Sequence, residues 1–171
     1  MALTRGRGRG RGLSTLRAAT LGRMTGVVEQ IAIASERKEL PAPVARVRAR
    51  AGHGLEGEYH YSDAAEPGAA LTLIAREALE GLREDTGIEV SHEASRRNVL
   101  TTGIDLNELV GVRFKVGEVE CEGVELCEPC LTLAKLTAFG VLRGLVHRGG
   151  LRADIVSDGE LAVGDPVRAS F

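Results

Sequence analysis

Three cysteines close together in the second half of the chain are the residues best suited to chemistry. The sequence has 171 residues, and Cys121, Cys127 and Cys130 fall within ten of them. Cys127 and Cys130 belong to a Cys-Glu-Pro-Cys segment between a predicted strand and a predicted helix. Cys130 falls at the start of that helix, where backbone N–H groups and the helix dipole favour a thiolate. A thiolate can act as a nucleophile, a persulfide carrier or a soft-metal ligand.

Each cysteine also has a structural explanation. A free cysteine is often a small buried apolar residue, and Cys121, inside a predicted strand, fits that description best. The C-x-x-C spacing allows a thioredoxin-like redox pair, but the βαβ context of that motif is missing. The cysteines could also form a Cys₃His zinc site with one of the four histidines, His53, His60, His92 or His147. We expect Cys130, and after it Cys127, to be the candidate catalytic residues.

A glycine-rich segment at residues 52–60, GHGLEGEYH, is suited to binding. Its three glycines permit positive φ angles and close approach of a ligand to the backbone. Consecutive N–H groups in such a turn can hold a phosphate. The spacing matches neither the dinucleotide fingerprint nor the Walker loop, so a plain tight turn is the alternative.

The segment Arg96-Arg97-Asn98 supplies two cations within a strand predicted over residues 95–102. Neighbouring residues of a strand face opposite sides, so one arginine can be solvated while the other reaches a pocket. The guanidinium group suits bidentate anion binding. The alternative is a solvated edge strand.

The elements that must position these residues are mostly short strands. The chain contains 22 glycines, five aromatic residues and no tryptophan, which favours turns and strands over a helical bundle. A helix with Thr72 as its N-cap and Gly87 as its closing residue is predicted over residues 71–84. A second helix is predicted over 131–146, and a short helical turn at 104–109. These features predict an α+β fold built on a β-barrel or curved sheet with two main helices. Strands are predicted at residues 27–33, 44–50, 95–102, 112–116 and 119–126, and a terminal hairpin at 153–169.

The first 23 residues differ from the rest in composition. They contain six arginines and no acid, and include the repeat RGRGRGRG, so we expect a disordered extension followed by one domain over residues 24–171. This stretch is an unselected extension ahead of a start at Met24, an Arg-Gly tail for nucleic acid, or a transit peptide.

Charge and hydropathy narrow the classes of protein further. Residues 24–171 hold 16 basic and 24 acidic residues, and this acidic balance argues against a domain that coats nucleic acid. No apolar run reaches the roughly 18–20 residues that a transmembrane helix needs. An odd number of clustered cysteines does not suit a secreted disulfide framework, so we expect a cytoplasmic protein.

Four motifs in order resemble those of the MOSC domain, found at the C-terminus of molybdenum cofactor sulfurases and as stand-alone bacterial proteins. Residues 54–58, GLEGE, resemble the family's G-[IVL]-E-G-D turn. Residues 97–106, RNVLTTGIDL, resemble its R/E-N-[IL]-x-[TV]-x-G-[IV]-D-L segment, and residues 109–119 its L-x-G-x-x-F-x-[IV]-G-x-[AV] strand pair. Pro129-Cys130 falls where the family has its Pro-Cys. The resemblance covers residues 25–171.

The resemblance implies a strand-rich, barrel-like fold and a pocket for the molybdenum–pterin cofactor. Cys130 would ligate molybdenum or hold a persulfide, and Cys127 would resolve that persulfide or accept a second sulfur. An anionic cofactor with a soft metal suits N–H groups, arginine and a thiolate. The implied cofactor-binding residues are Gly54, Glu56, Gly57, Glu58, Arg97 and Asn98.

The sequence also departs from the family pattern. Glu58 replaces the usual Asp of the turn, which lengthens the side chain by one methylene. We find no counterpart of the N-terminal β-barrel of the longer reductases, nor of a cysteine-desulfurase domain, so pyridoxal phosphate is not expected.

The resulting hypothesis is a molybdenum-cofactor protein for sulfur transfer or for reduction of N-oxygenated compounds. Its partner would be a cysteine desulfurase or an electron-donor protein, and no membrane or nucleic acid is expected. The sequence leaves open whether the protein is itself an enzyme. The alternatives are a persulfide carrier without molybdenum and a structural zinc-binding domain.

Overall fold

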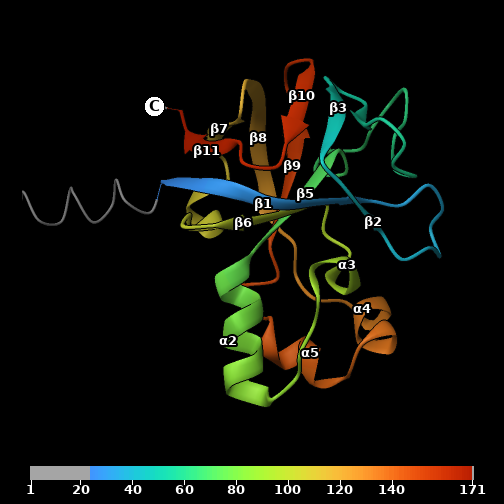
Figure 1. Ribbon diagram of the computed structural model, residues 1–171, viewed down its shortest axis with the longest axis vertical. Helices are drawn as coiled ribbons and strands as arrows, with labels where there is room; N and C mark the ends of the chain where they lie inside the picture. Colours follow the sequence, from blue (N-terminus) through green and yellow to red (C-terminus); the bar gives the residue numbers. More distant parts are fainter. Residues whose placement is uncertain (1–23, 171) are drawn as a thin grey trace, which may run out of the picture.

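Seven strands close into a barrel in the computed structural model, which describes residues 24–170 (Figure 1). Around the barrel they run in the order β1-β6-β5-β9-β8-β7-β11, and β11 pairs with β1 to complete the ring. Only the β5–β6 pair within this ring is parallel. The strands are β1 (Thr25–Ile33), β5 (Leu71–Ala75), β6 (Val99–Thr102), β7 (Arg113–Val116), β8 (Val119–Leu126), β9 (Leu151–Ile155) and β11 (Pro166–Ala169). The disordered extension predicted for residues 1–23 lies outside the described residues.

A three-stranded sheet stands beside the barrel. It consists of β3 (Arg46–Arg50), β4 (Gly54–Leu55) and β10 (Gly159–Ala162), with β3 in the middle. The strand predicted over residues 44–50 is interrupted at Ala45, because β2 (Ala42–Val44) pairs with β1 while β3 pairs with β10 and β4. β3 leads directly into the glycine-rich turn.

The barrel interior is filled by the inward-facing side chains of its strands. In β9, for example, Leu151, Ala153 and Ile155 are buried and alternate with partly exposed residues. Phe114, the largest fully buried side chain, belongs to the same cluster. Burial of this apolar surface is the main force that closes the ring, and the predicted α+β barrel-like class is confirmed.

The helices gather below the barrel in Figure 1. A second apolar cluster, Leu82, Val90, Leu133, Val141 and Leu145, joins three of them. No helix of residues 24–170 is long and apolar enough to cross a membrane. The helices are α2 (Arg76–Thr86), α3 (His92–Ser95), α4 (Leu131–Leu136) and α5 (Gly140–Gly144), with a 3₁₀ turn η1 (Leu106–Leu109) at the predicted short helical turn.

The helix predicted over residues 71–84 is wrong in its first part. Leu71 and Leu73 lie in β5, fully buried between β6 and β9, and the helix begins only at Arg76. Barrel pairing therefore overrides the helical spacing of the apolar residues. The predicted end is confirmed, because Gly87 closes α2 with φ 72°.

The helix predicted over residues 131–146 is divided in two. α4 ends at Leu136, and the hydroxyl of the following residue, Thr137, donates to the Leu133 carbonyl at 2.7 Å. Threonine and Gly140 both have low helix propensity. The break lets α5 turn back so that Leu145 packs with Leu82 of α2.

Arg96 and Arg97 do not lie in a strand. Ser91 caps α3 by accepting the Ala94 N–H at 3.2 Å, and Arg96 ends α3 with φ 61°. β6 begins only at Val99. The predicted alternation of Arg96 and Arg97 across a strand is therefore wrong, because residues 96–98 form the turn that leads from α3 into β6.

The predicted terminal hairpin is also wrong. β9 pairs with β5 and β8, β10 pairs with β3, and β11 pairs with β1 and β7. Barrel closure gives each segment partners far away in sequence and leaves the local pairing unused.

Candidate functional site

Cys130 is the exposed cysteine of the three. It is the N-cap residue of α4, in an extended conformation with φ −120° and ψ 167°. Cys121 is buried in β8 and Cys127 is buried in the segment that follows β8. The predicted placement of Cys130 at a helix start is confirmed, and it leaves one thiol open to solvent.

The surroundings of Cys130 favour its ionised form. Partial burial raises the pKa of the thiol, but the backbone N–H groups of Leu133 and Thr132 and the positive charge of Arg97 together outweigh burial, so the pKa lies below its usual value. Burial alone raises the pKa of Cys121 to about 12. Cys130 is therefore the better nucleophile and soft ligand of the two.

Arg97 is a buried cation held by neutral acceptors. Only 7% of its surface is exposed. Its guanidinium donates to three backbone carbonyls, those of Ser95 at 2.9 Å, Gly149 at 3.0 Å and Cys127 at 3.1 Å. None of the ion pairs within residues 24–170 includes Arg97. Its positive charge thus remains available to an anion nearby.

The segment of residues 127–130, here called the cysteine loop, is fixed at several points besides Arg97. The Cys127 N–H donates to the Gly150 carbonyl at 2.7 Å. The Glu128 carboxylate accepts the His147 N–H at 3.0 Å and lies 3.0 Å from the His147 ring nitrogen Nδ1. These contacts join the loop to the residues that lead into β9.

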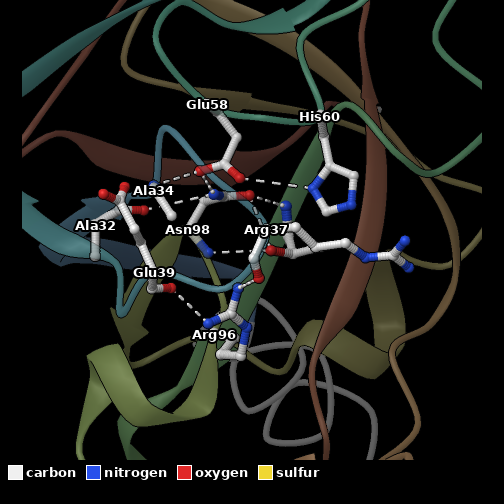
Figure 2. A network of polar contacts seen from close by, with 9 residues as sticks. Ala32, Ala34, Arg37, Glu39, Glu58, His60, Arg96 and Asn98 are labelled. Carbon is white, nitrogen blue, oxygen red and sulfur yellow. Dashed lines mark hydrogen bonds and ion pairs between the residues drawn. The ribbon is translucent and has the colours of Figure 1, made fainter. Parts of the chain in front are cut away.

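Glu58 anchors the glycine-rich turn from inside the protein (Figure 2). Its buried carboxylate accepts the Ala34 N–H at 2.9 Å and the Asn98 amide at 3.2 Å, and His60 Nδ1 lies 3.6 Å from its other oxygen. The Asn98 side-chain oxygen in turn accepts the Thr72 hydroxyl at 2.9 Å. The turn is thereby fixed to the end of β1 and the start of β6.

The other residues of the turn serve its geometry. Gly54 and Gly57 have φ of 121° and 87°, so the predicted positive φ angles are confirmed. The N–H groups of Glu56 and Glu58 donate to the carbonyls of Arg48 and Leu55 and are already partnered. The Glu56 carboxylate is not part of the Glu58 network, because it pairs with Arg50 at 2.9 Å.

The two predicted motifs meet at one dipeptide. Arg97 holds the cysteine loop, and Asn98, the next residue, holds the turn through Glu58. The structure therefore brings Cys127, Cys130, Arg97, Asn98 and Glu58 to the junction between α3 and β6, and leaves Glu56 outside it.

A model of the MOSC domain family matches residues 56–168. The chain belongs to the MOSC domain family. The match covers the turn from Glu56 onward, the segment of residues 97–106, the strand pair of residues 109–119 and Pro129-Cys130.

Solved structures show that the fold is that of other proteins of low sequence identity. The YuaD protein of Bacillus subtilis aligns with a TM-score of 0.77 at 16% identity, covering 86% of this chain and 97% of that chain. YiiM of Geobacillus stearothermophilus aligns with a TM-score of 0.62 at 13% identity, covering 87% and 75%. YiiM of Escherichia coli gives 0.63 at 16% identity, covering 85% and 70%. No curated protein matches the sequence.

Several residues make contacts in this MOSC site that were not predicted from the sequence. Arg96 donates to the carbonyls of Arg37 and Glu39 at 2.8 and 2.7 Å and so holds the segment after β1 (Figure 2). Thr72, predicted as a helix cap, binds Asn98 instead. His60 lies two residues after Glu58 in the glycine-rich segment. This closeness in sequence was the one local signal that could have indicated its contact with Glu58.

Two cavities of the MOSC domain have no residue of the cysteine loop in their lining. One, of about 400 Å³, is lined by the start of α2, residues 103–107, Arg148 and Gly150. The other, of about 310 Å³, lies between α2 and α3. Neither is lined by Cys127, Cys130 or a predicted cofactor-binding residue. The candidate site is therefore identified by the chemistry of the donors at Cys130 and not by the size of a cavity.

The described residues do not form the alternative zinc site. Within residues 24–170 no three His, Cys, Asp or Glu side chains are grouped closely enough to hold a metal ion. Cys121 faces the barrel interior, in the same apolar cluster as Phe114.

Proposed function

We propose that this MOSC protein binds a molybdenum–pterin cofactor through Cys130 and acts in sulfur transfer or in reduction of N-oxygenated compounds. The observation that carries this proposal is an exposed thiol whose ionised form is favoured by two backbone N–H groups and by Arg97. A thiolate is the type of donor that a soft metal prefers. Membership of the MOSC family supplies the cofactor class.

The donor set fits such a cofactor. Cys130 would hold the metal, which when bound supplies a redox centre or a site for sulfur. Arg97 has five N–H donors, and three of them go to backbone carbonyls. The remaining two, with the unbalanced positive charge, suit the phosphate or dithiolene end of the cofactor.

The residues of the glycine-rich turn would stabilise this site without binding the cofactor through their own side chains. Glu58 and Asn98 direct their polar groups at each other and at the backbone, so they would fix the turn beside Arg97. Gly54 and Gly57 supply the positive φ angles that the turn needs. Glu56, paired with Arg50, would contribute least to cofactor binding.

The open position of Cys130 also suits contact with a second protein. An electron-donor protein would serve the reductase activity and a cysteine desulfurase the sulfur-transfer activity. Either needs access to the working centre, and the exposed thiol provides it.

The deciding experiment measures molybdenum, zinc and pterin in protein purified from a host that makes the cofactor. We expect near-stoichiometric molybdenum and pterin in the wild type and loss of molybdenum in Cys130→Ala. Cys121→Ala, which alters a buried thiol of the barrel, is the control and should keep its molybdenum. A wild type without molybdenum and pterin, or a Cys130→Ala variant that retains both, would contradict the proposal.

A persulfide carrier without molybdenum is the second candidate, favoured by the C-x-x-C spacing of Cys127 and Cys130. The Cys130 thiolate would attack the outer sulfur of a donor persulfide, forming Cys130–S–SH and releasing the donor thiolate. Incubation with a desulfurase and cysteine should add about 32 Da to Cys130. An unmodified Cys130 in a reduced, folded sample counts against this candidate.

A further inference from the structure

The Arg97 guanidinium connects three segments that are far apart in the chain. Its acceptors are the carbonyls of Ser95 at the end of α3, Cys127 in the cysteine loop, and Gly149 before β9. A planar guanidinium can donate in several directions from one buried position. An ammonium group on a lysine stem cannot reproduce that fork.

The same loop is packed tightly against the segment that Arg97 binds. A Cβ atom at Gly149 would lie 2.3 Å from the Cys127 carbonyl oxygen and 3.3 Å from the Pro129 nitrogen. The Cys127 N–H is bound by Gly150. Both backbone groups of Cys127 are thus fixed, and the residue is only 3% exposed, although Cys130, three residues later, is open to solvent.

We propose that Arg97 is a positioning residue that holds the cysteine loop in the form in which Cys130 alone is accessible and Cys127 is withheld. This inference rests on the proposed function in that Cys130 is the working thiol. The contacts that support the inference do not depend on the cofactor, because they are hydrogen bonds within the chain.

Withholding Cys127 has a chemical consequence for sulfur carried on Cys130. A free Cys127 thiolate would attack the inner sulfur of a Cys130 persulfide. The two cysteines would then form a disulfide, and the outer sulfur would leave as hydrosulfide, so the cysteines are oxidised and the carried sulfur is reduced. When the Cys127 side chain is held in its buried position, this attack does not occur and the persulfide on Cys130 persists until an acceptor arrives.

The test counts accessible thiols in the native, reduced protein without cofactor. Iodoacetamide labels the wild type, Arg97→Lys, Arg97→Met and Gly149→Ala, and peptide mapping by mass spectrometry assigns each label. We expect Cys130 alone to be labelled in the wild type. Cys127 should be labelled about tenfold faster or more in the two Arg97 variants, because losing hydrogen bonds to a charged donor shifts a local opening equilibrium by that order. It should also be labelled faster in Gly149→Ala, because the added Cβ would displace the Cys127 carbonyl that Arg97 binds.

Arg96→Lys is the matched control, since Arg96 also donates to two backbone carbonyls but holds a different segment. It should leave Cys127 unlabelled. Cys121, buried in the barrel, reports general unfolding and should stay unlabelled in every variant.

Two results would overturn the inference. One is an unlabelled Cys127 in folded Arg97→Lys and Gly149→Ala. The other is labelling of Cys121 at the same rate as Cys127, which would show general destabilisation in place of local release. Molybdenum content, measured separately, decides the proposed function, so the two can fail independently.

Discussion

At the scale of single residues, the three cysteines differ because their surroundings differ. The pKa of Cys130 lies below its usual value and that of Cys121 is raised to about 12. Alkylation requires the thiolate, so we expect the rate at Cys130 to reach half its maximum at a lower pH than the rate at an unperturbed free thiol does. Iodoacetamide kinetics from pH 6 to 10 with peptide mapping would measure it. A midpoint at or above that of a free thiol would contradict the assigned surroundings.

Removing the charge of either of two glutamates in the same turn should change the stability of the protein by very different amounts. Glu58→Gln weakens buried bonds to Ala34 and Asn98, and we expect a loss of about 1.5–3 kcal/mol in the free energy of unfolding. Glu56→Gln disturbs a half-exposed pair with Arg50 and should cost about 0–1 kcal/mol. Urea unfolding followed by circular dichroism compares the two, and equal losses would show that the Glu58 network contributes little.

From the sequence, the candidate site residues could be chosen more reliably than their contacts could be predicted. Cys130 could be placed at a helix start because that signal is local. The partners of Arg97 could not be predicted, since Gly149 and Cys127 are 52 and 30 residues away. No local pattern shows that a buried arginine will meet carbonyls instead of a ligand.

At the scale of elements, whether a short segment forms a helix or a strand depends on the segments with which it pairs or packs. Residues 71–75 have helical spacing of apolar side chains, yet both edges of β5 are paired in the barrel. The first half of the strand predicted at 95–102 is instead the last residue of α3 and the turn that follows it. The Ser91 cap of α3 is a local signal that the alternation of residue types obscured. The strand Val119–Leu126, whose neighbours β7 and β9 lie on its two sides, was predicted with its observed bounds.

The cluster beneath the barrel holds α4, and with it Cys130. Leu82 of α2 is fully buried in this cluster together with Leu133, the third residue after Cys130. Leu82→Ala should lower the free energy of unfolding by about 2–5 kcal/mol, because it leaves a cavity. Arg83→Ala, on the exposed side of α2, should change it by less than about 0.5 kcal/mol. Thermal unfolding of both variants tests this, and a loss below 1 kcal/mol for Leu82→Ala would mean that the helices are not packed as one unit.

At the scale of the whole molecule, closure of the barrel explains why the fold class could be predicted but its topology could not. Glycine content and short alternating segments indicated a curved sheet. The closing pair, however, joins Thr25 to Arg168, almost the full length of the domain. Such pairing leaves no trace in a local pattern, and it removes the open edges that a hairpin at the end of the chain would have left.

The closing strand β11 therefore offers the sharpest test of the architecture. Val167 is fully buried, and it is paired with Gly26 of β1 on one side and Val116 of β7 on the other. Val167→Asp would place an unpaired carboxylate in the core, at a cost of several kcal/mol, against a total stability of about 5–15 kcal/mol for a typical domain. We expect loss of cooperative thermal unfolding and an enlarged hydrodynamic radius, measured by circular dichroism and gel filtration. Arg168→Asp changes the exposed neighbour in the same strand and should stay folded; a cooperative, near-wild-type melting curve for Val167→Asp would show that the barrel does not depend on this closure.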